Sequence, residues 1–320
     1  MINQKILVTG ASGFVGKSLC AELLSQGYSV LAAVRSSSSV VKNAEMVTIG
    51  EIDGDADWTD ALKGVDVVIH LAARVHVMKD TALEPLTEFR KVNVEGTLNL
   101  ALQAAEAGVK RFIFISSIGV NGNATDLERS FTADDTPHPH DPYSVSKYEA
   151  ELGLQKIAKE TGLEVVIIRP PLIYGYDAPG NFKKLINALV KRLPLPLGAI
   201  HNKRSFVYVG NLVDLIIRCI NHPAAANQVF LVSDGHDLST TELLRGCAVA
   251  LGVKARLLPV PKSLIEVGAA LLGKRNVAQR LCGNLQLDIT KARTLLGWTP
   301  PYTIGQGLRA TAERFRNIRS

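Results

Sequence analysis

A tyrosine and a lysine stand four residues apart in the segment YSVSK, residues 143–147. On a helix, positions i and i+4 share one face, so the side chains of Tyr143 and Lys147 are expected to point the same way. A tyrosine with a pKa of about 10 is a poor base at neutral pH unless a nearby cation stabilises its phenolate. With Lys147 as that cation, Tyr143 can exchange a proton with a substrate hydroxyl or carbonyl group. An isolated pair at this spacing is more often a solvated Tyr/Lys pair, so the assignment depends on neighbouring motifs.

Two serines favour the catalytic interpretation. Ser116 and Ser117 stand at the end of the apolar run RFIFIS, which begins at residue 111 and is typical of a strand. Ligands of a parallel α/β sheet bind at the carboxyl ends of its strands. A hydroxyl group at that edge can hold a substrate oxygen opposite the tyrosine, so these residues form a candidate catalytic set.

The segment TGASGFVG, residues 9–16, is typical of a phosphate-binding turn. Its glycines, Gly10, Gly13 and Gly16, follow a strand-like run and open a helix-like stretch. Without side chains the backbone can turn tightly and approach a pyrophosphate, and a helix N-terminus favours that negative charge. The spacing differs from the G-x-G-x-x-G of many dehydrogenases. Three glycines also suit a plain turn, but their place between a first strand and a first helix favours dinucleotide binding.

The elements that position these motifs alternate regularly as far as about residue 170. Continuous apolar runs predict strands at residues 5–9, 30–34, 65–73, 111–116 and 163–169. Helix-like stretches at 16–27, 88–108 and 144–162 lie between several of them, and each ends at a glycine. Strands that are apolar throughout suit a parallel sheet covered on both faces. We therefore predict an α/β fold with a doubly wound parallel sheet, of the Rossmann type.

After Arg169 the pattern becomes less regular and prolines interrupt it. We expect a dinucleotide-binding domain at residues 1–169, rejoined by about 204–233. A smaller C-terminal α+β domain at 170–203 and 234–320 would bind the substrate. The leucine- and alanine-rich stripe from Leu264 to Leu272 predicts a packing face.

The composition disfavours nucleic acid and membrane insertion. An apolar share of 47% fits a folded chain with a large core, and the net charge of +6 comes without runs of lysine or arginine. No apolar stretch reaches the roughly 18 residues that a membrane span needs, and no signal-peptide pattern opens the chain. Cys20, Cys219, Cys247 and Cys282 form no C-x-x-C pair, so we expect reduced, mostly buried thiols of a cytoplasmic protein.

Other polar residues have plainer explanations. His138, His140 and Asp141 stand close together in PHPHDP, residues 137–142, but the prolines favour a solvated loop over a metal site. His70 closes an apolar strand and is expected to be a packed, hydrogen-bonded histidine. The basic stretch at Lys274 and Arg275, with Arg280 nearby, could reach a second phosphate, although a solvated helix end is favoured.

These motifs together resemble the extended short-chain dehydrogenase/reductase family. The matching segments are TGASGFVG, HLAA at 70–73, NVEGT at 93–97, ISS at 115–117 and YSVSK. Within that family the chain is most similar to NAD(P)-dependent nucleotide-sugar epimerases, dehydratases and 4-ketoreductases of the UDP-glucose 4-epimerase type. Their later segments are present as well: RPPLIYG at 169–175, RSFVYVGNLVDLI at 204–216 and DITKARTLLGW at 288–298. The resemblance covers essentially the whole chain.

The resemblance implies roles for single residues. Tyr143 is then the acid/base, Lys147 its partner, Ser117 the ligand of the substrate oxygen and Asn93 a supporting residue on a helix. The implied cofactor-binding residues are Gly10, Ser12, Gly13, Phe14, Val15, Arg35, Ser36, Ile52, Leu71, Ala72, Ala73, Tyr143, Lys147 and Pro170.

The implied substrate site is basic. Arg204 and Asn181 would contact a nucleotide diphosphate, since a guanidinium group matches phosphate geometry, and Arg280 could reach a second phosphate. The resemblance also implies a homodimer, with a small-molecule nucleotide sugar as the partner.

The chain departs from the dehydratases of this family. Those enzymes carry an Asp-Glu pair directly after the catalytic hydroxyl residue, where this chain has Ile118 and Gly119, so 4,6-dehydration is not expected. Leu172 also replaces the asparagine of the R-x-x-N segment.

The run VLAAVRSSSS, residues 30–39, bears on the choice of cofactor. NAD-binding versions of the fold place Asp or Glu at the end of the second strand, where it binds the ribose 2′-hydroxyl. This chain has Val34 and Arg35 there, and Arg35 with Ser36 or Ser37 could bind a 2′-phosphate. We therefore favour NADP(H) over NAD, with a mobile, solvated loop as the plainer interpretation.

Two reactions at C4 of a UDP-hexose or UDP-N-acetylhexosamine derivative remain. The cofactor argument favours a 4-ketoreductase or dehydrogenase that exchanges NADPH. The alternative is a 4-epimerase with tightly bound NAD, which would use the same Ser117, Tyr143 and Lys147. A non-catalytic NADP(H) sensor is a remote third interpretation, because such proteins typically lose the tyrosine or the lysine.

Overall fold

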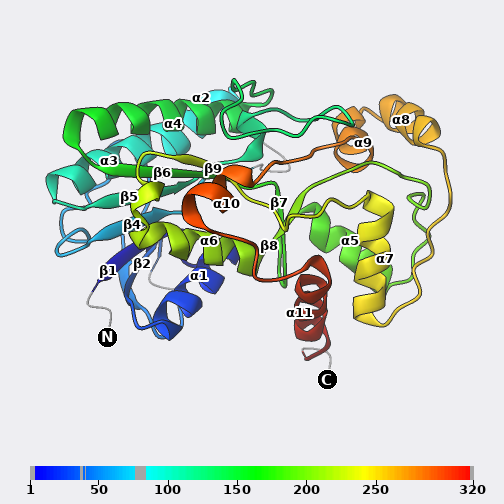
Figure 1. Ribbon diagram of the computed structural model, residues 1–320, viewed down its shortest axis with the longest axis horizontal. Coiled ribbons are helices and arrows are strands. Elements are labelled where there is room, and N and C mark those ends of the chain that lie inside the picture. Colours follow the sequence, from blue (N-terminus) through cyan, green and yellow to red (C-terminus); the bar gives the residue numbers. More distant parts are fainter. Residues whose placement is uncertain (1–3, 37–38, 40, 76–83, 318–320) are drawn as a thin grey trace.

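The computed structural model describes residues 4–36, 39, 41–75 and 84–317. Seven parallel strands form its main sheet in the order β3-β2-β1-β4-β5-β6-β9 (Figure 1). The strands are β1 (Lys5–Thr9), β2 (Ser29–Val34), β3 (Glu45–Thr48), β4 (Val67–His70), β5 (Arg111–Ile115), β6 (Glu164–Arg169) and β9 (Val229–Leu231). The predicted doubly wound α/β fold is confirmed. Because the chain winds outward from β1 and then returns to β4, the strand order reverses between these two strands, where such folds bind their ligands.

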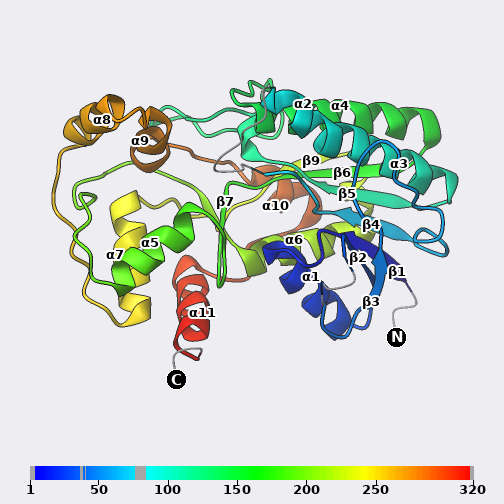
Figure 2. The ribbon, with the colours of Figure 1, turned by 180° about the vertical axis from the view of Figure 1, so that it is seen from behind.

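Helices cover both faces of this sheet (Figures 1 and 2). Ile6 of β1 packs with α1 and α6, whereas Leu7 of the same strand packs with α3 and α4. The covering helices are α1 (Phe14–Ser25), α2 (Pro85–Arg90), α3 (Gly96–Glu106), α4 (Pro142–Thr161), α6 (Val209–Asn221) and α10 (Thr290–Leu296). Neighbouring side chains of a strand point to opposite faces, so burial on both sides explains the continuously apolar strands.

The three predicted helices of this half occur, with one interruption. Gly27, Gly108 and Gly162 follow α1, α3 and α4 with φ of 85°, 79° and 79°, which is the left-handed backbone that favours glycine after a helix. The stretch expected to be one helix at 88–108 is divided by a π-helical turn, Lys91–Glu95, between α2 and α3.

The second half of the chain adds a smaller sheet and five helices to the part described. Strands β7 (Leu172–Tyr174) and β8 (Phe206–Tyr208) pair in parallel. The helices are α5 (Asn181–Val190), α7 (Thr240–Leu251), α8 (Lys262–Leu271), α9 (Arg275–Cys282) and α11 (Ile304–Asn317). Phe182, Leu244 and Leu308 bring α5, α7 and α11 into one apolar cluster. Short 3₁₀ turns lie at Ile118–Val120 and Pro223–Ala225.

The prediction that the stripe from Leu264 to Leu272 is a packing face is wrong for most of its apolar side chains. Leu264, Val267 and Leu271 are 62%, 58% and 84% exposed, and no residue of α8 is fully buried. Ile265 alone of these large side chains is half-buried, against the cluster of α5, α7 and α11. Only one side of α8 contacts the rest of the protein, so the side chains on its other sides remain exposed.

All four cysteines are buried free thiols, as expected. Within the described ranges, no helix has the length and apolar character needed to cross a membrane.

Candidate active site

The glycine-rich turn joins β1 to α1 at the reversal of strand order. Gly10 has a φ of 65°, and a Cβ atom there would lie 2.8 Å from the backbone nitrogen of Ala72. A Cβ atom on Gly16 would collide with the carbonyl oxygen of Gly10. The Gly13 N–H donates to that same oxygen at 2.9 Å and Gly13 caps α1, so the turn holds its tight shape only with these glycines.

The residues after β4 form the facing wall of this turn. The Ala72 N–H donates to the Thr9 hydroxyl at 3.2 Å, and that hydroxyl lies 2.8 Å from Nδ1 of His70. Nε2 of His70 lies 3.0 Å from the Thr97 hydroxyl. Burial lowers the pKa of His70 to about 3, with the charge of Lys147 as a smaller cause, so this histidine is neutral. As predicted, His70 is a packed, hydrogen-bonded residue; it ties α3 to the turn.

Asn93 fixes the catalytic helix to this wall. It is buried in the π-helical turn, and its Nδ2 donates to the Arg74 carbonyl and to the Ser146 hydroxyl, both at 3.0 Å. Its Oδ1 accepts the Arg74 N–H at 2.8 Å. Ser146 lies on α4, so one side chain connects α4 with the segment after β4. Local π-helical turns of this kind are frequent at functional sites.

Helix α4 presents Tyr143 and Lys147, as the spacing predicted. Asp141 caps the helix by accepting the Ser144 N–H at 2.8 Å, and Pro142 occupies the first turn. The half-buried ring of Tyr143 meets the ring of Phe89 edge-on. Burial raises the pKa of Tyr143 to about 12, and the negative charge of Asp141 adds to the effect.

Lys147 is buried, with its Nζ 3.8 Å from the centre of the Phe114 ring. Burial lowers its pKa to about 7, against an opposing contribution from the carboxylate of Glu151. An ammonium group over an aromatic face gains cation–π attraction, which offsets part of the lost hydration. The lysine therefore titrates close to neutral pH instead of remaining fully charged.

The structure separates the two serines that the sequence grouped. Ser116 is buried, and its hydroxyl donates to Glu151 at 2.5 Å. Glu151 also receives two hydrogen bonds from Arg169, at 3.0 and 2.5 Å. Ser116 thus belongs to a buried polar network beneath the site. Ser117 is half-buried, and its hydroxyl accepts the Gly119 N–H at 3.1 Å.

Gly119 brings Ser117 close to the first turn of α4. A Cβ atom built on Gly119 would collide with the hydroxyl of Ser144 and would lie 3.3 Å from the hydroxyl of Ser117. Ser144 directly follows Tyr143. The loop after β5 and the start of α4 are therefore packed together at the carboxyl edge of the sheet.

Two arginines of the second half of the chain, Arg204 and Arg280, lie close to each other. Arg204 is buried, donates to the Gly283 carbonyl at 2.9 Å, and has its pKa lowered to about 10 by burial and by the charge of Arg280. Arg280 on α9 is exposed, and its guanidinium lies 3.9 Å from the carboxylate of Asp141. Arg280 therefore reaches the residue that caps the catalytic helix. An anion placed by these two cations would relieve their mutual repulsion.

The remaining predicted residues lie in the glycine-rich turn, next to the loop after β5 and against α3. Ser12, Phe14 and Val15 stand in the glycine-rich turn and the start of α1. Pro170 is buried, and its carbonyl accepts the Ile118 N–H at 3.0 Å. Ile52 is half-buried and packs against Gly96, the first residue of α3.

The adenosine end predicted from VLAAVRSSSS follows β2. Thr9 pairs with Ala33, so the end of β2 and the glycine-rich turn lie at the same edge of the sheet. Arg35 and Ser36 are exposed there. Ser37 lies outside the described residues. Asn181 is the first residue of α5, and its side chain also lies outside the described part.

The PHPHDP loop shows a pair of histidines in contact. Nδ1 of His138 lies 3.0 Å from Nε2 of His140, and Asp141 is engaged as the cap of α4. In the described ranges, no group of three or more histidine, cysteine or acidic side chains is arranged to hold a metal ion.

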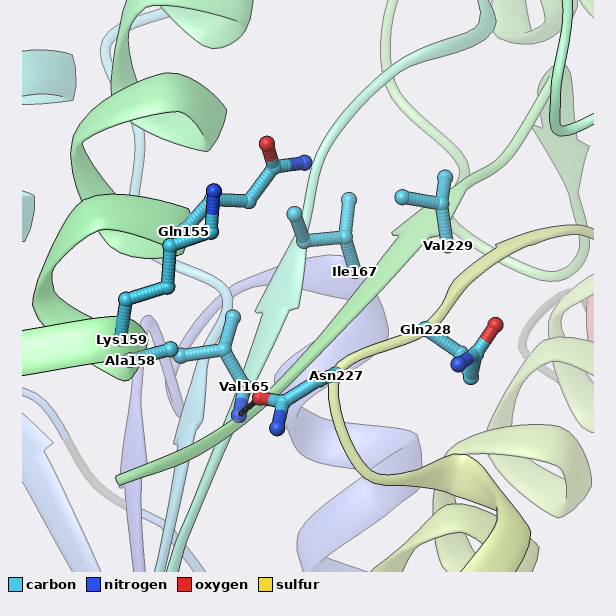
Figure 3. A pocket seen from close by; sticks show the side chains of 8 residues that line it. All are labelled: Gln155, Ala158, Lys159, Val165, Ile167, Asn227, Gln228 and Val229. Atoms are coloured by element: carbon cyan, nitrogen blue, oxygen red, sulfur yellow. Dashed lines mark hydrogen bonds between the residues drawn. The ribbon is translucent and has the colours of Figure 1, made fainter. Parts of the chain in front are cut away.

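A pocket of about 320 Å³ lies away from all these residues, at the sheet edge formed by β9 (Figure 3). Helix α4 contributes Gln155, Ala158 and Lys159, and Figure 3 also shows the Val165 N–H bonded to Asn227. The other lining residues are Ile167, Gln228 and Val229. None of them is a predicted site residue, so this pocket is separate from the candidate active site.

Sequence reasoning missed the network around Glu151. Tyr143, Lys147 and Glu151 recur every four residues, so the periodicity of α4 could have identified the carboxylate. Arg169 at the end of an apolar strand was a second signal, since a buried arginine needs an anionic partner. Asn121 completes the network by accepting a hydrogen bond from Arg169 at 2.9 Å.

The model of a family described as the NAD dependent epimerase/dehydratase family matches residues 6–233. A UDP-glucose 4-epimerase of Vibrio cholerae is 48% identical over 315 residues, which cover 98% of this chain and 95% of that protein.

Two solved structures at 25% identity share the whole fold. A UDP-glucose 4-epimerase with UDP-glucose from Thermotoga maritima has a TM-score of 0.79 and covers 99% of this chain and 100% of its own. MoeE5 in complex with UDP-glucuronic acid and NAD also has a TM-score of 0.79 and covers 98% of this chain and 99% of its own.

Proposed function

Because the chain belongs to the NAD dependent epimerase/dehydratase family, we propose that it is a 4-epimerase of a UDP-hexose or UDP-N-acetylhexosamine. The observation that carries the proposal is the 48% identity to a UDP-glucose 4-epimerase along nearly the whole chain. The grouping of Ser117, Tyr143 and Lys147 at the carboxyl edge of the sheet supports it. The 4-ketoreductase that the sequence put first becomes the second candidate.

The turn between β1 and α1 fits a dinucleotide. Gly10 and Gly16 leave room where Cβ atoms would collide with backbone, and the α1 N-terminus favours a pyrophosphate charge. We propose NAD as the resident cofactor, in line with the family and with the NAD-bound neighbour. When bound, NAD supplies the acceptor and donor for the hydrogen at C4. The NAD would stay bound because the molecule that accepts the hydride from C4 must also return it.

In this proposal Tyr143 removes the proton from the C4 hydroxyl group and later returns it to the ketone. A tyrosine with a pKa of about 12 needs positive charge nearby before it can act as a base. Lys147 and the oxidised nicotinamide ring would provide that charge. Ser117 donates a hydrogen bond to the same substrate oxygen, so the reacting oxygen lies between two hydroxyl groups.

Arg204 and Arg280 are proposed to hold the nucleotide diphosphate. Charge repulsion from Arg280 contributes to the lowered pKa of Arg204, so an anion between them would be stabilised by both groups. Ile118 and Gly119 follow Ser117, and neither side chain can act as an acid in an elimination. The proposed chemistry therefore stops at C4.

One observation still favours the ketoreductase as second candidate. Arg35 stands exposed at the end of β2, where many NAD enzymes place a carboxylate. A guanidinium group at this place would bind a 2′-phosphate, and NADP(H) suits an enzyme that exchanges its cofactor. The two candidates therefore differ in which dinucleotide is found and in whether it leaves.

The decisive experiment denatures the purified protein and identifies the released nucleotide. The epimerase predicts close to one NAD per chain, and interconversion of UDP-glucose with UDP-galactose, or of their N-acetyl forms, without added cofactor. Tyr143→Phe should then reduce the rate by roughly 10²-fold or more while the bound nucleotide remains. Tyr148→Phe on the same helix is the matched control and should retain activity.

A different result would assign the second candidate. An empty site, together with stoichiometric NADPH oxidation by a UDP-4-ketosugar, would exclude the epimerase. Full activity in Tyr143→Phe would exclude Tyr143 as the acid/base.

We also propose the domain division 1–169 with 204–233, and 170–203 with 234–320. Every strand of the main sheet falls in the first pair of ranges, while α5, α7 and α11 fall in the second. A homodimer is proposed as well, and Leu102 on α3 and Leu152 on α4, both nearly half-exposed, offer a neighbouring apolar surface. Analytical ultracentrifugation tests the dimer.

A further inference from the structure

Helix α8 exposes a row of large apolar side chains. Leu264, Val267 and Leu271 follow one another at helical spacing and are 62%, 58% and 84% exposed, and Leu272 beside them is 71% exposed. Gly268 lies among them, and a Cβ atom on it would meet nothing within 4 Å. An amphipathic helix normally turns such a face to the core. A contiguous exposed face of this kind marks an interaction surface.

Positive charge is concentrated in the sequence on both sides of this face. Residues 252–287 contain six lysines and arginines but a single acidic residue, Glu266, so this segment holds +5 of the chain's net charge of +6. The six basic residues, all exposed, are Lys254, Arg256, Lys262, Lys274, Arg275 and Arg280. Arg280 faces Asp141 in the candidate active site, so we call the other five basic residues, with Leu264, Val267, Leu271 and Leu272, the α8 patch. Its charge excess arises within about a tenth of the chain.

Helix α8 lies at the end of the molecule opposite β1 and β2 (Figures 1 and 2). Both views place α8 beside α9 at an outer corner. The exposed apolar side chains of α8 therefore belong to a helix that stands apart from the main sheet.

We propose that the α8 patch docks this protein onto the surface of an anionic lipid bilayer. Helices that lie in a membrane interface combine an apolar face with a lysine- and arginine-rich flank. The apolar side chains would enter the acyl boundary, while the basic side chains meet negatively charged headgroups. The positive charge favours an anionic lipid surface over a second copy of the chain, because two such patches facing each other would repel.

The test measures cosedimentation of the full-length protein with vesicles of phosphatidylglycerol and phosphatidylethanolamine. We expect binding that weakens at high salt and is lost with vesicles of phosphatidylcholine. Leu264→Glu combined with Leu271→Glu should abolish sedimentation. Val249→Glu is the matched control, since Val249 is 81% exposed on α7, outside the α8 patch.

A second pair of variants tests the charge. Lys274→Gln with Arg275→Gln should weaken binding to the anionic vesicles on the order of tenfold. Lys63→Gln with Lys156→Gln removes the same charge from exposed residues elsewhere and should leave binding unchanged. All variants must unfold at the temperature of the parent protein, which separates lost docking from lost folding.

Three results would overturn the proposal. These are no sedimentation with anionic vesicles, equal sedimentation of the Leu264→Glu/Leu271→Glu variant, and equal binding to phosphatidylcholine. Self-association that this double variant abolishes would assign the face to a second copy instead. No substrate or turnover enters these measurements, so they stand independently of the epimerase assignment.

Discussion

Lys147 and Glu151 lie one turn apart on α4, and their side chains are both buried, at 1% and 0% exposure. Glu151 accepts hydrogen bonds from Arg169 and from Ser116, so its charge is held in place beneath the lysine. Its carboxylate opposes the effect of burial on the pKa of Lys147. The lysine proposed to assist Tyr143 thus has a fixed, buried counter-charge one turn away. Glu151 itself is none of the predicted ligand-binding residues.

The first prediction concerns the pH dependence of stability. The pKa of Lys147 falls from 10.5 to about 7 on folding, so between these values the unfolded chain binds more protons than the native protein. The contribution of Lys147 to the free energy of unfolding therefore rises as the pH increases from about 7 towards 10.5, and it is lowest below pH 7. In nucleotide-free protein, Lys147→Met should be more stable than the parent at pH 6 to 7, by up to roughly 5 kcal/mol. Urea titrations of both proteins across this pH range measure the difference.

The gap between the two proteins should close at alkaline pH. A constant difference between pH 6 and pH 10 would contradict the lowered pKa of Lys147.

The second prediction concerns the buried ion pair. Glu151→Gln leaves the charge of Arg169 buried without its counter-charge, which should cost about 3–5 kcal/mol in the free energy of unfolding. Replacing both residues with leucine should cost much less than twice that amount, because no isolated charge remains. Urea unfolding of Glu151→Leu, Arg169→Leu and the double variant gives the coupling energy.

An exposed pair provides the control. Lys156 and Glu160 lie on the surface of the same helix, and Glu160→Gln should change the free energy of unfolding by about 0.5 kcal/mol or less. If Glu151→Gln behaves like this control, the pair does not stabilise the fold.

The main sheet and the order of its motifs could be predicted because strands buried on both faces are apolar throughout, and such runs are visible in the sequence. The runs at 5–9 and 163–169 coincide closely with β1 and β6. The spacing of Tyr143 and Lys147 carried the same kind of information for α4.

What the sequence did not predict depends on contacts between distant segments. Nothing in a helical pattern distinguishes the π-helical turn that places Asn93 against the Arg74 backbone. The strand pattern alone did not separate Ser116 from Ser117, whereas the family resemblance gave the ligand role to Ser117, and the structure shows that Ser116 is bonded to Glu151. The stripe on α8 was wrongly predicted to be a packing face, because periodicity cannot say whether a partner element covers it.

The third prediction concerns Gly119. In Gly119→Ala the new methyl group would collide with the hydroxyl of Ser144 and would lie 3.2 Å from its Cβ atom, so either the Ser144 side chain rotates or the loop that carries Ser117 shifts relative to Tyr143. A displacement of this kind should reduce kcat by roughly 10-fold to 10²-fold. Ser144→Ala removes the colliding oxygen, and the double variant Gly119→Ala/Ser144→Ala should recover most of the rate. Steady-state kinetics of the three variants provide the measurement, and a double variant as slow as Gly119→Ala would exclude the collision as the cause.

The fourth prediction concerns Arg35 and the ribose 2′ position. Arg35 is exposed directly after β2, and the pairing of β1 with β2 places this point at the same edge as the glycine-rich turn. Any affinity for a 2′-phosphate should therefore depend on its guanidinium group, because a charge-assisted hydrogen bond contributes about 1.5–3 kcal/mol. Arg35→Asp should weaken NADP(H) binding on the order of 10²-fold, since it also introduces repulsion, and should leave NAD(H) binding equal or stronger. Calorimetric titration of nucleotide-free protein with each dinucleotide measures both affinities, and Arg35→Gln separates loss of attraction from added repulsion. If Arg35→Asp changes neither affinity, the loop after β2 takes no part in choosing the cofactor.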